Sequence, residues 1–583
     1  MFEQFCTGVV DADTMAVLEK SQYSHRRLAF RALLDQFAAN PHVVGALVDP
    51  ERAWRILAAA EERDSDAVAD VLMYPTVGVW LTRALHHTRP ASSSPTWGEL
   101  GYLHLIAAAA AIRCGVPCTL RVPASHGAIT LPTVGQARVP GSFPVGTVEA
   151  ICAGPNSRLQ ITKDVHVDLA TTSPAFTPSE RYTCQSRGLV LRAWFEDRDP
   201  YRGFGAPMPP STLADSALAE WRKLVAEAWD VLTLHHQPHA RELAAGLRTL
   251  VPIRPDSDVV GASSPSAFGG IGLSANGSAA EIAEAMVHEL QHSKLNALLG
   301  LVKLVQDEET RCYAPWRDDS RPLVGLLHGV VAFTSGVEFW LTQRDVMEEA
   351  EGHGVDFDMA FRRLQVRRAV RFLLNSGKLT NVGSALVAAV SRRLLVCEQV
   401  SVVPELAAIV TAMVDDHRAL WRLRFIRPDA NVIDSLADAW LSGTTPSVPA
   451  TADNKLLPDD QRRLPANRRN LLRAKAVEPD LFASLMSRPA TLPGTTPRAD
   501  AALCLGDGDG AAAAYRAVLC DDPYDAQAWV GLGLAMRIRR RTAAATALLI
   551  RPEITVSAYR RVRLLDETQP DPREFADWVG RAL

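Results

Sequence analysis

The chain has 583 residues, of which 47% are hydrophobic and 22% are charged. This composition is typical of a soluble globular protein and excludes a disordered or fibrous class, and the length predicts two to four domains. With 62 Lys and Arg against 66 Asp and Glu, the formal net charge is -4, which gives no electrostatic reason to expect a nucleic acid or an anionic membrane as partner.

The sequence shows no sign of membrane insertion or export. Its longest mostly apolar stretch, roughly ten residues at Leu103–Ile112, is shorter than the ~20 residues that span a bilayer. The first residues lack the basic region of a secretion signal. Nine cysteines at irregular spacing are typical of free thiols in a reducing compartment. We therefore expect a cytoplasmic protein that binds no membrane.

The first two predicted regions differ in their apolar periodicity. Residues 1–115 are expected to be helical, because Leu28–Ala39 and Arg52–Glu62 repeat apolar side chains every three to four positions. Residues 116–205 are rich in short β-branched runs separated by Gly, Pro, Ser or Asn. We predict a sheet of about five strands there, at 118–122, 128–131, 146–151, 159–164 and 189–195.

The third predicted region, 206–445, returns to helix. Helices are expected at Leu213–Leu232 and His239–Leu250, and two strands, Val259-Val260 and Phe268–Leu273, precede a long helix. The glycines of the second strand would allow a peptide to lie along it as an added strand. We interpret 206–445 as a metal-binding catalytic domain, for reasons that follow from its long helix.

The last predicted region, 446–583, begins with a linker rich in Pro, Thr and Asp and continues as helix. Within 498–550 the small, aromatic and terminating residues follow the roughly 34-residue register of a tetratricopeptide repeat. The residues that fit this register are Ala511, Tyr515, Pro523, Trp529, Leu532 and Gly533. The predicted class is α+β and predominantly helical: an HExxH helix at its centre, a small mixed or antiparallel sheet, and a C-terminal tetratricopeptide-like region.

One motif indicates chemistry, the sequence His288-Glu289-Leu290-Gln291-His292. It lies in a predicted helix, Ala279–Val305, that begins with a capping box of Ser278 and Glu281. Side chains four residues apart share a helix face, so His288 and His292 can bind one metal ion with Glu289 beside them. About 0.02 such matches are expected by chance in this chain. A metal site is therefore favoured over two incidental histidines.

The sequence motifs alone do not decide which residue is the third metal ligand. In zinc peptidases the Glu of this motif activates a zinc-bound water, and the gluzincin type takes a third ligand from a later Glu. Glu308, Glu309 and Glu338 are at suitable distances along the chain, whereas the metzincin type is excluded because Leu295 and Leu298 replace its Gly and His. His328, on the helix that starts near Pro322, is favoured over these glutamates as the third ligand, because two histidine ligands are already present on one helix. It follows a segment that contains Tyr313, Trp316, Arg317 and Arg321.

The chain resembles the HExxH-motif peptide-modification proteins that are encoded beside precursors of ribosomally synthesised, post-translationally modified peptides. The resemblance is carried by 263–274, 287–295, 313–323 and 325–329, and more weakly by Trp194–Arg202 and the C-terminal run that contains Trp529. It covers about 190–540. Members of that family are described as Fe(II)- and 2-oxoglutarate-dependent peptide β-hydroxylases.

The resemblance implies a site, a cosubstrate and a partner. His288, His292 and His328 would be the iron ligands, in place of the usual two-His-one-carboxylate set. Arg317 or Arg321 would bind the far carboxylate of 2-oxoglutarate, with Tyr313 nearby. Glu289 would hold water, orient a ligand or assist proton delivery. The partner would be a precursor peptide, and the alternative is a zinc-dependent metallopeptidase with Glu289 as general base.

Two further clusters have plain interpretations. His235, His236 and His239 are expected in a polar turn, because Pro238 interrupts a helix there. The arginines at 362, 363, 367, 368 and 371 form a basic cluster on a predicted helix. A solvated helix face explains this cluster, with a peptide contact as the alternative.

Overall fold

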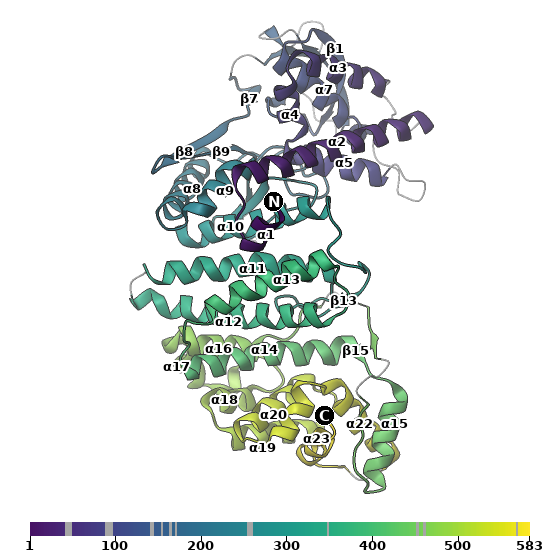
Figure 1. The fold of residues 1–583 in the computed structure, drawn as a ribbon, viewed down its shortest axis with the longest axis vertical. Coiled ribbons are helices and arrows are strands. Elements are labelled where there is room, and N and C mark those ends of the chain that lie inside the picture. Colours follow the sequence, from purple (N-terminus) through teal and green to yellow (C-terminus); the bar gives the residue numbers. More distant parts are fainter. Residues whose placement is uncertain are drawn as a thin grey trace. The chain divides into compact units, whose positions relative to one another are not determined.

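The structure is a computed structural model that divides into two compact units, Met1–Leu304 and Val305–Leu583, and each is described by itself. The protein is 61% helical with several small sheets, so the predicted α+β, mostly helical class is confirmed (Figure 1). The division falls inside the range 206–445 that the sequence predicts as one domain. The described residues are 1–40, 49–87, 97–139, 145–152, 156–161, 166–169, 172–253, 260–346, 349–449, 454–458, 462–566 and 569–583.

Unit 1 begins with seven helices, in agreement with the predicted helical region. Their bounds are α1 Phe2–Thr7, α2 Ala12–Ala39, α3 Pro50–Arg63, α4 Ser65–Leu72, α5 Pro75–His87, α6 Trp97–Leu100 and α7 Tyr102–Cys114. The alanines at 107–111 of α7 are fully buried, and their small side chains let α3, α4 and the first strand of the sheet lie close to α7.

The first sheet of unit 1 has seven strands in the order β6-β5-β4-β1-β2-β3-β7, all pairs antiparallel. The strands are β1 Cys118–Ser125, β2 Ala128–Leu131, β3 Gly135–Arg138, β4 Val145–Cys152, β5 Arg158–Gln160, β6 His166–Asp168 and β7 Phe176–Pro178. The strands predicted at 118–122, 128–131 and 146–151 are confirmed. The one predicted at 159–164 is only the short β5, and most of its second half lies outside the described residues.

A second sheet of five strands, in the order β11-β12-β10-β9-β8, corrects the prediction of one sheet. β10 is parallel to both β9 and β12, and β11 is antiparallel to β12. The predicted strand at 189–195 belongs here. The strands are β8 Arg181–Ser186, β9 Leu189–Phe195, β10 Thr249–Ile253, β11 Gly261–Ala262 and β12 Gly270–Ser274.

Two predictions near this sheet need correction. The helix expected at His239–Leu250 ends earlier, because α9 covers Gln237–Gly246 and the apolar run after it forms β10. The glycine-rich β12 is paired on both sides, so it cannot accept a peptide as an added strand. The polar turn expected for His235, His236 and His239 is reduced to a break at the buried His236, because His235 ends α8 (Asp215–His235) and His239 lies in α9, with Pro238 in its first turn. Val259 lies outside the described residues.

The HExxH motif lies on α10, Ala279–Leu299, which packs on β11 and β12. The predicted capping box is present, since Ser278 Oγ accepts from the Glu281 N–H and the Glu281 carboxylate accepts from the Ser278 N–H. The helix ends at Leu299 rather than at Val305, because the chain turns at Gly300.

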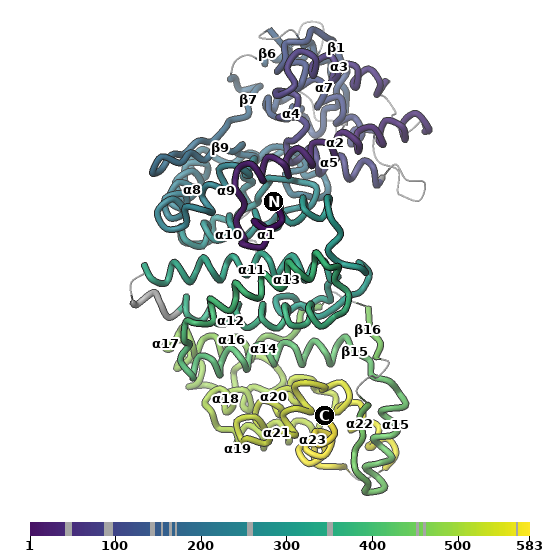
Figure 2. The backbone as a smooth tube through the Cα atoms, viewed as in Figure 1, coloured from purple at the N-terminus to yellow at the C-terminus, as the bar shows by residue number. Residues whose placement is uncertain are grey.

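Unit 2 consists mainly of helices (Figure 2). They are α11 Leu323–Arg344, α12 Glu349–Asn375, α13 Asn381–Cys397, α14 Pro404–Phe425, α15 Ala430–Leu441, α16 Asn467–Val477, α17 Pro479–Met486, α18 Pro497–Leu505, α19 Gly508–Asp521, α20 Ala526–Ile538, α21 Thr542–Leu549, α22 Pro552–Leu565 and α23 Pro572–Gly580. Two short ribbons join β13 Arg311–Cys312 to β14 Arg321–Pro322 and β15 Ile426–Arg427 to β16 Lys455–Leu456. Helices α18 to α21 contact one another in succession, and their tetratricopeptide character stays a prediction.

One helix of unit 2 is more apolar than the sequence interpretation recognised. By length and composition alone α11 qualifies to cross a membrane, and 67% of its most apolar window is buried inside the protein. A core helix of a soluble protein meets the same criterion. The sequence interpretation overlooked this stretch, because Gly, Ser, Thr, His and Glu interrupt its apolar residues.

Candidate functional site

Helix α10 brings the two histidines of the motif together. The His288 and His292 rings have centroids 4.9 Å apart and planes at 80°. Burial lowers the pKa of His292 to about 4, so its imidazole is neutral at physiological pH, the form that binds a metal. His288 Nδ1 lies 3.8 Å from Glu284 Oε1, one turn earlier on α10. A carboxylate beside the far nitrogen is a common support for a metal-binding imidazole.

Glu289 is held rigidly between α10 and the edge of the second sheet. Its side chain is buried, and its Oε2 accepts a hydrogen bond of 2.5 Å from Ser263 Oγ. A Cβ on Gly261 of β11 would lie only 2.8 Å from Glu289 Oε1, so only glycine lets the strand pass this close. Burial raises the pKa of Glu289 to about 7, and Glu284 adds to this effect while the Ser263 hydrogen bond opposes it.

In unit 2, the predicted ligand His328 lies on α11 between Leu327 and Gly329, both buried. The Trp316 indole packs on this helix, because a Cβ on Gly329 would overlap its ring, and it also contacts Phe333 with ring centroids 4.8 Å apart. The segment before α11 therefore packs, through Trp316, against the same helix that carries His328.

The two predicted cosubstrate arginines share one acidic partner in that segment. Arg317 Nε donates to Asp319 Oδ1 at 2.9 Å, and Arg321 NH1 donates to Asp319 Oδ2 at 3.2 Å. The arginine side chains are 53% and 39% exposed. Each guanidinium donates to Asp319 through one nitrogen only, so its other N–H groups are not bound to this carboxylate. Asp319 therefore already occupies part of the hydrogen-bonding capacity of both arginines.

Tyr313, the third predicted cosubstrate residue, is part of a chain of hydrogen bonds that the sequence did not reveal. Its hydroxyl is 2.7 Å from His417 Nδ1, and His417 Nε2 is 3.1 Å from Asp318 Oδ1. Because the carboxylate accepts, Nε2 carries the proton and Nδ1 accepts from the tyrosine. Burial lowers the pKa of His417, and the hydrogen bond with Asp318 opposes this effect. His417 lies 104 residues from Tyr313, so no local pattern could indicate this pair.

The segment 313–320 is fixed at several other points. Gln365 on α12 donates to the Pro315 carbonyl at 2.7 Å, and Arg311 Nε donates to Ser320 Oγ at 3.0 Å. Asp318 Oδ2 accepts from the Leu464 N–H at 3.1 Å. The segment thus holds two half-exposed arginine side chains on an anchored backbone.

The alternative third ligands have other surroundings in unit 2. The Glu338 carboxylate is bound by Arg393 through Nε at 2.8 Å and NH2 at 2.5 Å, a two-pronged ion pair. Glu308 and Glu309 are exposed in the turn before β13. Among the residues that the structure describes, no group of three or more His, Cys, Asp or Glu side chains is arranged to hold a metal ion.

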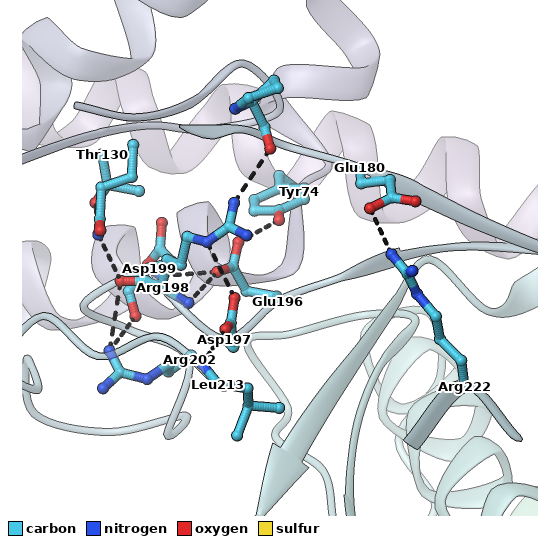
Figure 3. A network of polar contacts seen from close by, with 12 residues as sticks. Tyr74, Thr130, Glu180, Glu196, Asp197, Arg198, Asp199, Arg202, Leu213 and Arg222 are labelled. Carbon is cyan, nitrogen blue, oxygen red and sulfur yellow. Dashed lines mark hydrogen bonds and ion pairs between the residues drawn. The ribbon is translucent and has the colours of Figure 1, made fainter. Parts of the chain in front are cut away.

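A buried acidic network follows β9, in the segment Trp194–Arg202 that contributes to the family resemblance (Figure 3). Glu196 accepts from the Tyr74 hydroxyl and from the backbone N–H groups of residues 198 and 199. Asp199 accepts from Tyr102 at 2.5 Å. Burial raises the pKa of Asp199 to about 7, and the Glu196 charge adds to it. These bonds tie α7 and the residue before α5 to the segment that follows β9, so we assign the network a structural role.

A cavity of about 620 Å³ in unit 1 lies beside this network. Its walls are mostly apolar, with Trp221 from α8, Phe204 and Ile253 among them. A Cβ on Gly272 of β12 would contact Ile253 and Phe204, whereas Gly261 of β11 faces Glu289. The cavity therefore meets the sheet at Gly272, whereas the close approach to Glu289 is made by Gly261.

Comparison with known proteins adds no family assignment. No model of a known protein family matches the chain, and no curated protein matches it.

Proposed function

We propose that this chain is an Fe(II)- and 2-oxoglutarate-dependent hydroxylase that acts on a ribosomally synthesised precursor peptide. One observation carries the proposal: two imidazoles 4.9 Å apart share a face of a capped helix, and a buried glutamate follows the first of them in the chain. Apposed imidazoles suit a divalent transition metal, and a neutral His292 is ready to bind without losing a proton.

The proposed metal ligands are His288, His292 and His328. Support for the third comes from unit 2, where the competing Glu338 already binds Arg393 with both carboxylate oxygens. A metal that drew Glu338 away would leave Arg393, only 11% exposed, without its partner, which costs free energy. Bound iron(II) would supply the oxidation of a peptide C–H bond by O₂, with 2-oxoglutarate as the co-reductant.

The chain's own residues have separate tasks in this proposal. The Ser263 hydroxyl fixes the Glu289 carboxylate, which would orient a ligand of the metal or hold a water there. Arg317 and Arg321 provide a planar, two-pronged cation for the far carboxylate of 2-oxoglutarate, on a segment whose backbone is held by Gln365 and Leu464. Tyr313, earlier in the same segment, is positioned by its hydrogen bond to His417 and by the Trp421 ring.

A peptide substrate is supported by the edge of the second sheet. β11 is the last strand of this sheet in the described part of the chain, and it passes directly over Glu289. An extended peptide that pairs with the outer edge of β11 would run close to the HExxH face of α10. Backbone pairing of this kind accepts many side chains, as a peptide-modifying enzyme requires.

The second candidate is a zinc metallopeptidase in which Glu289 is the general base. It is favoured by the same position of Glu289 beside the two histidines. Mass spectrometry of the precursor peptide after incubation with protein, Fe(II) and 2-oxoglutarate separates the two. We expect a gain of one oxygen atom that requires 2-oxoglutarate. Backbone cleavage that does not require 2-oxoglutarate would overturn the hydroxylase proposal.

A matched set of variants tests the roles of individual residues. Glu289→Gln keeps the size of the side chain, so a peptidase would lose nearly all activity while a hydroxylase keeps a measurable fraction. Arg317→Ala and Arg321→Ala, tested alone and together, should raise the 2-oxoglutarate concentration needed for half-maximal rate. Arg498→Ala on α18, another exposed arginine, is the control and should leave it unchanged.

A further inference from the structure

A groove lies between α12 and α13 in unit 2, with a volume of about 310 Å³. Each helix lines it with residues spaced as i, i+3, i+4 and i+7, the spacing of a single helix face. The lining residues are Arg367, Val370, Arg371, Leu374 and Asn375 on α12, Ser391, Leu394 and Leu395 on α13, and Glu398, which caps the C-terminal end of α13. A smaller hollow of about 160 Å³ shares Arg367 and Glu398, so the groove continues toward the start of α14.

Large apolar side chains are exposed along this groove. Leu374 and Leu395 are 43% and 58% exposed although they line it. Phe372, two residues before Leu374, and Val396, directly after Leu395, do not line the groove but are also 46% and 61% exposed on the same two helices. Single exposed leucines are ordinary, but apolar side chains gathered from two helices around a hollow are typical of a surface that binds a partner.

The charge around the groove is positive, although the whole chain has a net charge of -4. Arg371 and Arg392 are exposed and form no ion pair with any described residue. Arg367 pairs with Glu398 at 3.5 Å across the groove, and this glutamate is the single acidic residue of the lining. The lining therefore holds two arginines against one glutamate, and Arg392, the chain neighbour of the lining residue Ser391, adds a third positive charge close by.

The other arginines of the basic cluster on α12 contact residues of unit 2 itself. They are therefore not part of the groove surface. Arg362 lies over the Phe333 ring, Arg363 donates to the carbonyls of Cys397 and Val400 at the end of α13, and Arg368 pairs with Asp415 at 2.6 Å. The interpretation of the whole cluster as one solvated helix face is therefore too simple. The exposed members are those that border the groove.

We propose that the groove between α12 and α13 docks an amphipathic helix with acidic flanks, supplied by a peptide or protein partner. Its apolar face would cover Leu374 and Leu395, and its carboxylates would pair with Arg371 and Arg392. A second copy of this chain does not fit, because symmetric docking of the groove on itself would bring arginines against arginines. The site is independent of the metal and of turnover.

The test uses a labelled synthetic helix of about fifteen residues, with Leu at i, i+3, i+4 and i+7 and Glu on its remaining positions, and a matched helix with Lys in place of Glu. Fluorescence anisotropy with the full-length protein measures binding. The acidic helix should bind at least tenfold more tightly than the basic one. Arg371→Glu with Arg392→Glu should reverse this preference, and Leu395→Asp should weaken binding of the acidic helix at least tenfold.

Matched controls are available in the same unit. Arg498→Glu on α18 and Leu564→Asp on α22, where Leu564 is 74% exposed, should leave binding unchanged. Equal binding of the two helices, or no response to the groove variants, would overturn the proposal. A concentration-dependent dimer that Leu395→Asp abolishes, without binding of the acidic helix, would also overturn it. Because the probe needs neither metal nor turnover, its failure would leave the hydroxylase proposal unaffected.

Discussion

Substitution of Gly329 by alanine tests whether Trp316 is seated on α11 as the structure has it. In an open helix position, glycine to alanine stabilises by about 1 kcal/mol, because glycine loses more backbone entropy on folding. At Gly329 the new Cβ would overlap the Trp316 ring and lie 2.7 Å from its Nε1. Trp316 also contacts Phe333, which limits how far the ring can move.

The magnitude follows from a comparison with Gly354 on α12, where a Cβ would meet nothing within 4 Å. Both variants gain the same stabilisation from replacing glycine by alanine in a helix, so this gain cancels when the two free energies of unfolding are compared. The remaining term is the overpacking at Trp316, about 1–3 kcal/mol. Gly329→Ala should therefore be less stable than Gly354→Ala by about this amount.

Hydrogen exchange of α11 and urea unfolding of both variants measure this difference. Local exchange is informative here because a chain of two units need not unfold in one step. In a Trp316→Ala background the Gly329→Ala change should become neutral or stabilising. Equal stabilisation by alanine at both positions would refute the seating of Trp316 on α11.

Three further predictions concern other polar contacts. Glu338→Gln should destabilise unit 2 by about 1–3 kcal/mol, because Arg393 loses a charged partner, while metal content stays unchanged; loss of metal would instead favour the peptidase. The Asp199 carboxyl has its pKa raised to about 7 by burial, so the folded state keeps a proton that the unfolded state releases, and this group lowers stability as pH rises from about 4 to 7. Asp199→Asn should flatten that part of the stability profile relative to the unchanged protein, and parallel profiles for the two proteins would show that Asp199 does not titrate there. Tyr313→Phe should cost about 0.5–1.5 kcal/mol in urea unfolding through loss of the bond to His417, and no change would show that this bond contributes nothing to stability.

Local patterns predicted local structure well in this chain. The capping box of Ser278 and Glu281 located the start of α10, and β-branched runs located β1, β2 and β4. The same patterns could not assign strands to sheets. The run at 189–195 pairs with β8 and β10, and the partner β10 was itself predicted as the end of a helix, because its apolar residues fit either period.

The candidate site was predictable only where its residues are close in sequence. His288, Glu289 and His292 are fixed by one helix turn, so their grouping follows from spacing alone. The support of Tyr313 by His417 and the pairing of Glu338 with Arg393 join residues far apart in the chain, 104 and 55 positions respectively. Burial of Glu289 against Gly261 depends on a sheet edge that no single-sequence pattern specifies.

The central claim is that His288, His292 and His328 bind a metal ion, and metal titration of the purified protein tests it most directly. Anaerobic titration with Fe(II), followed by metal analysis after removal of free ion, should give one bound ion per chain. His288→Ala with His292→Ala should abolish this binding, and His328→Ala should weaken it strongly, while Glu338→Ala should not, with circular dichroism confirming that each variant is folded. Unchanged metal binding in His328→Ala together with its loss in Glu338→Ala would contradict the proposed ligand set.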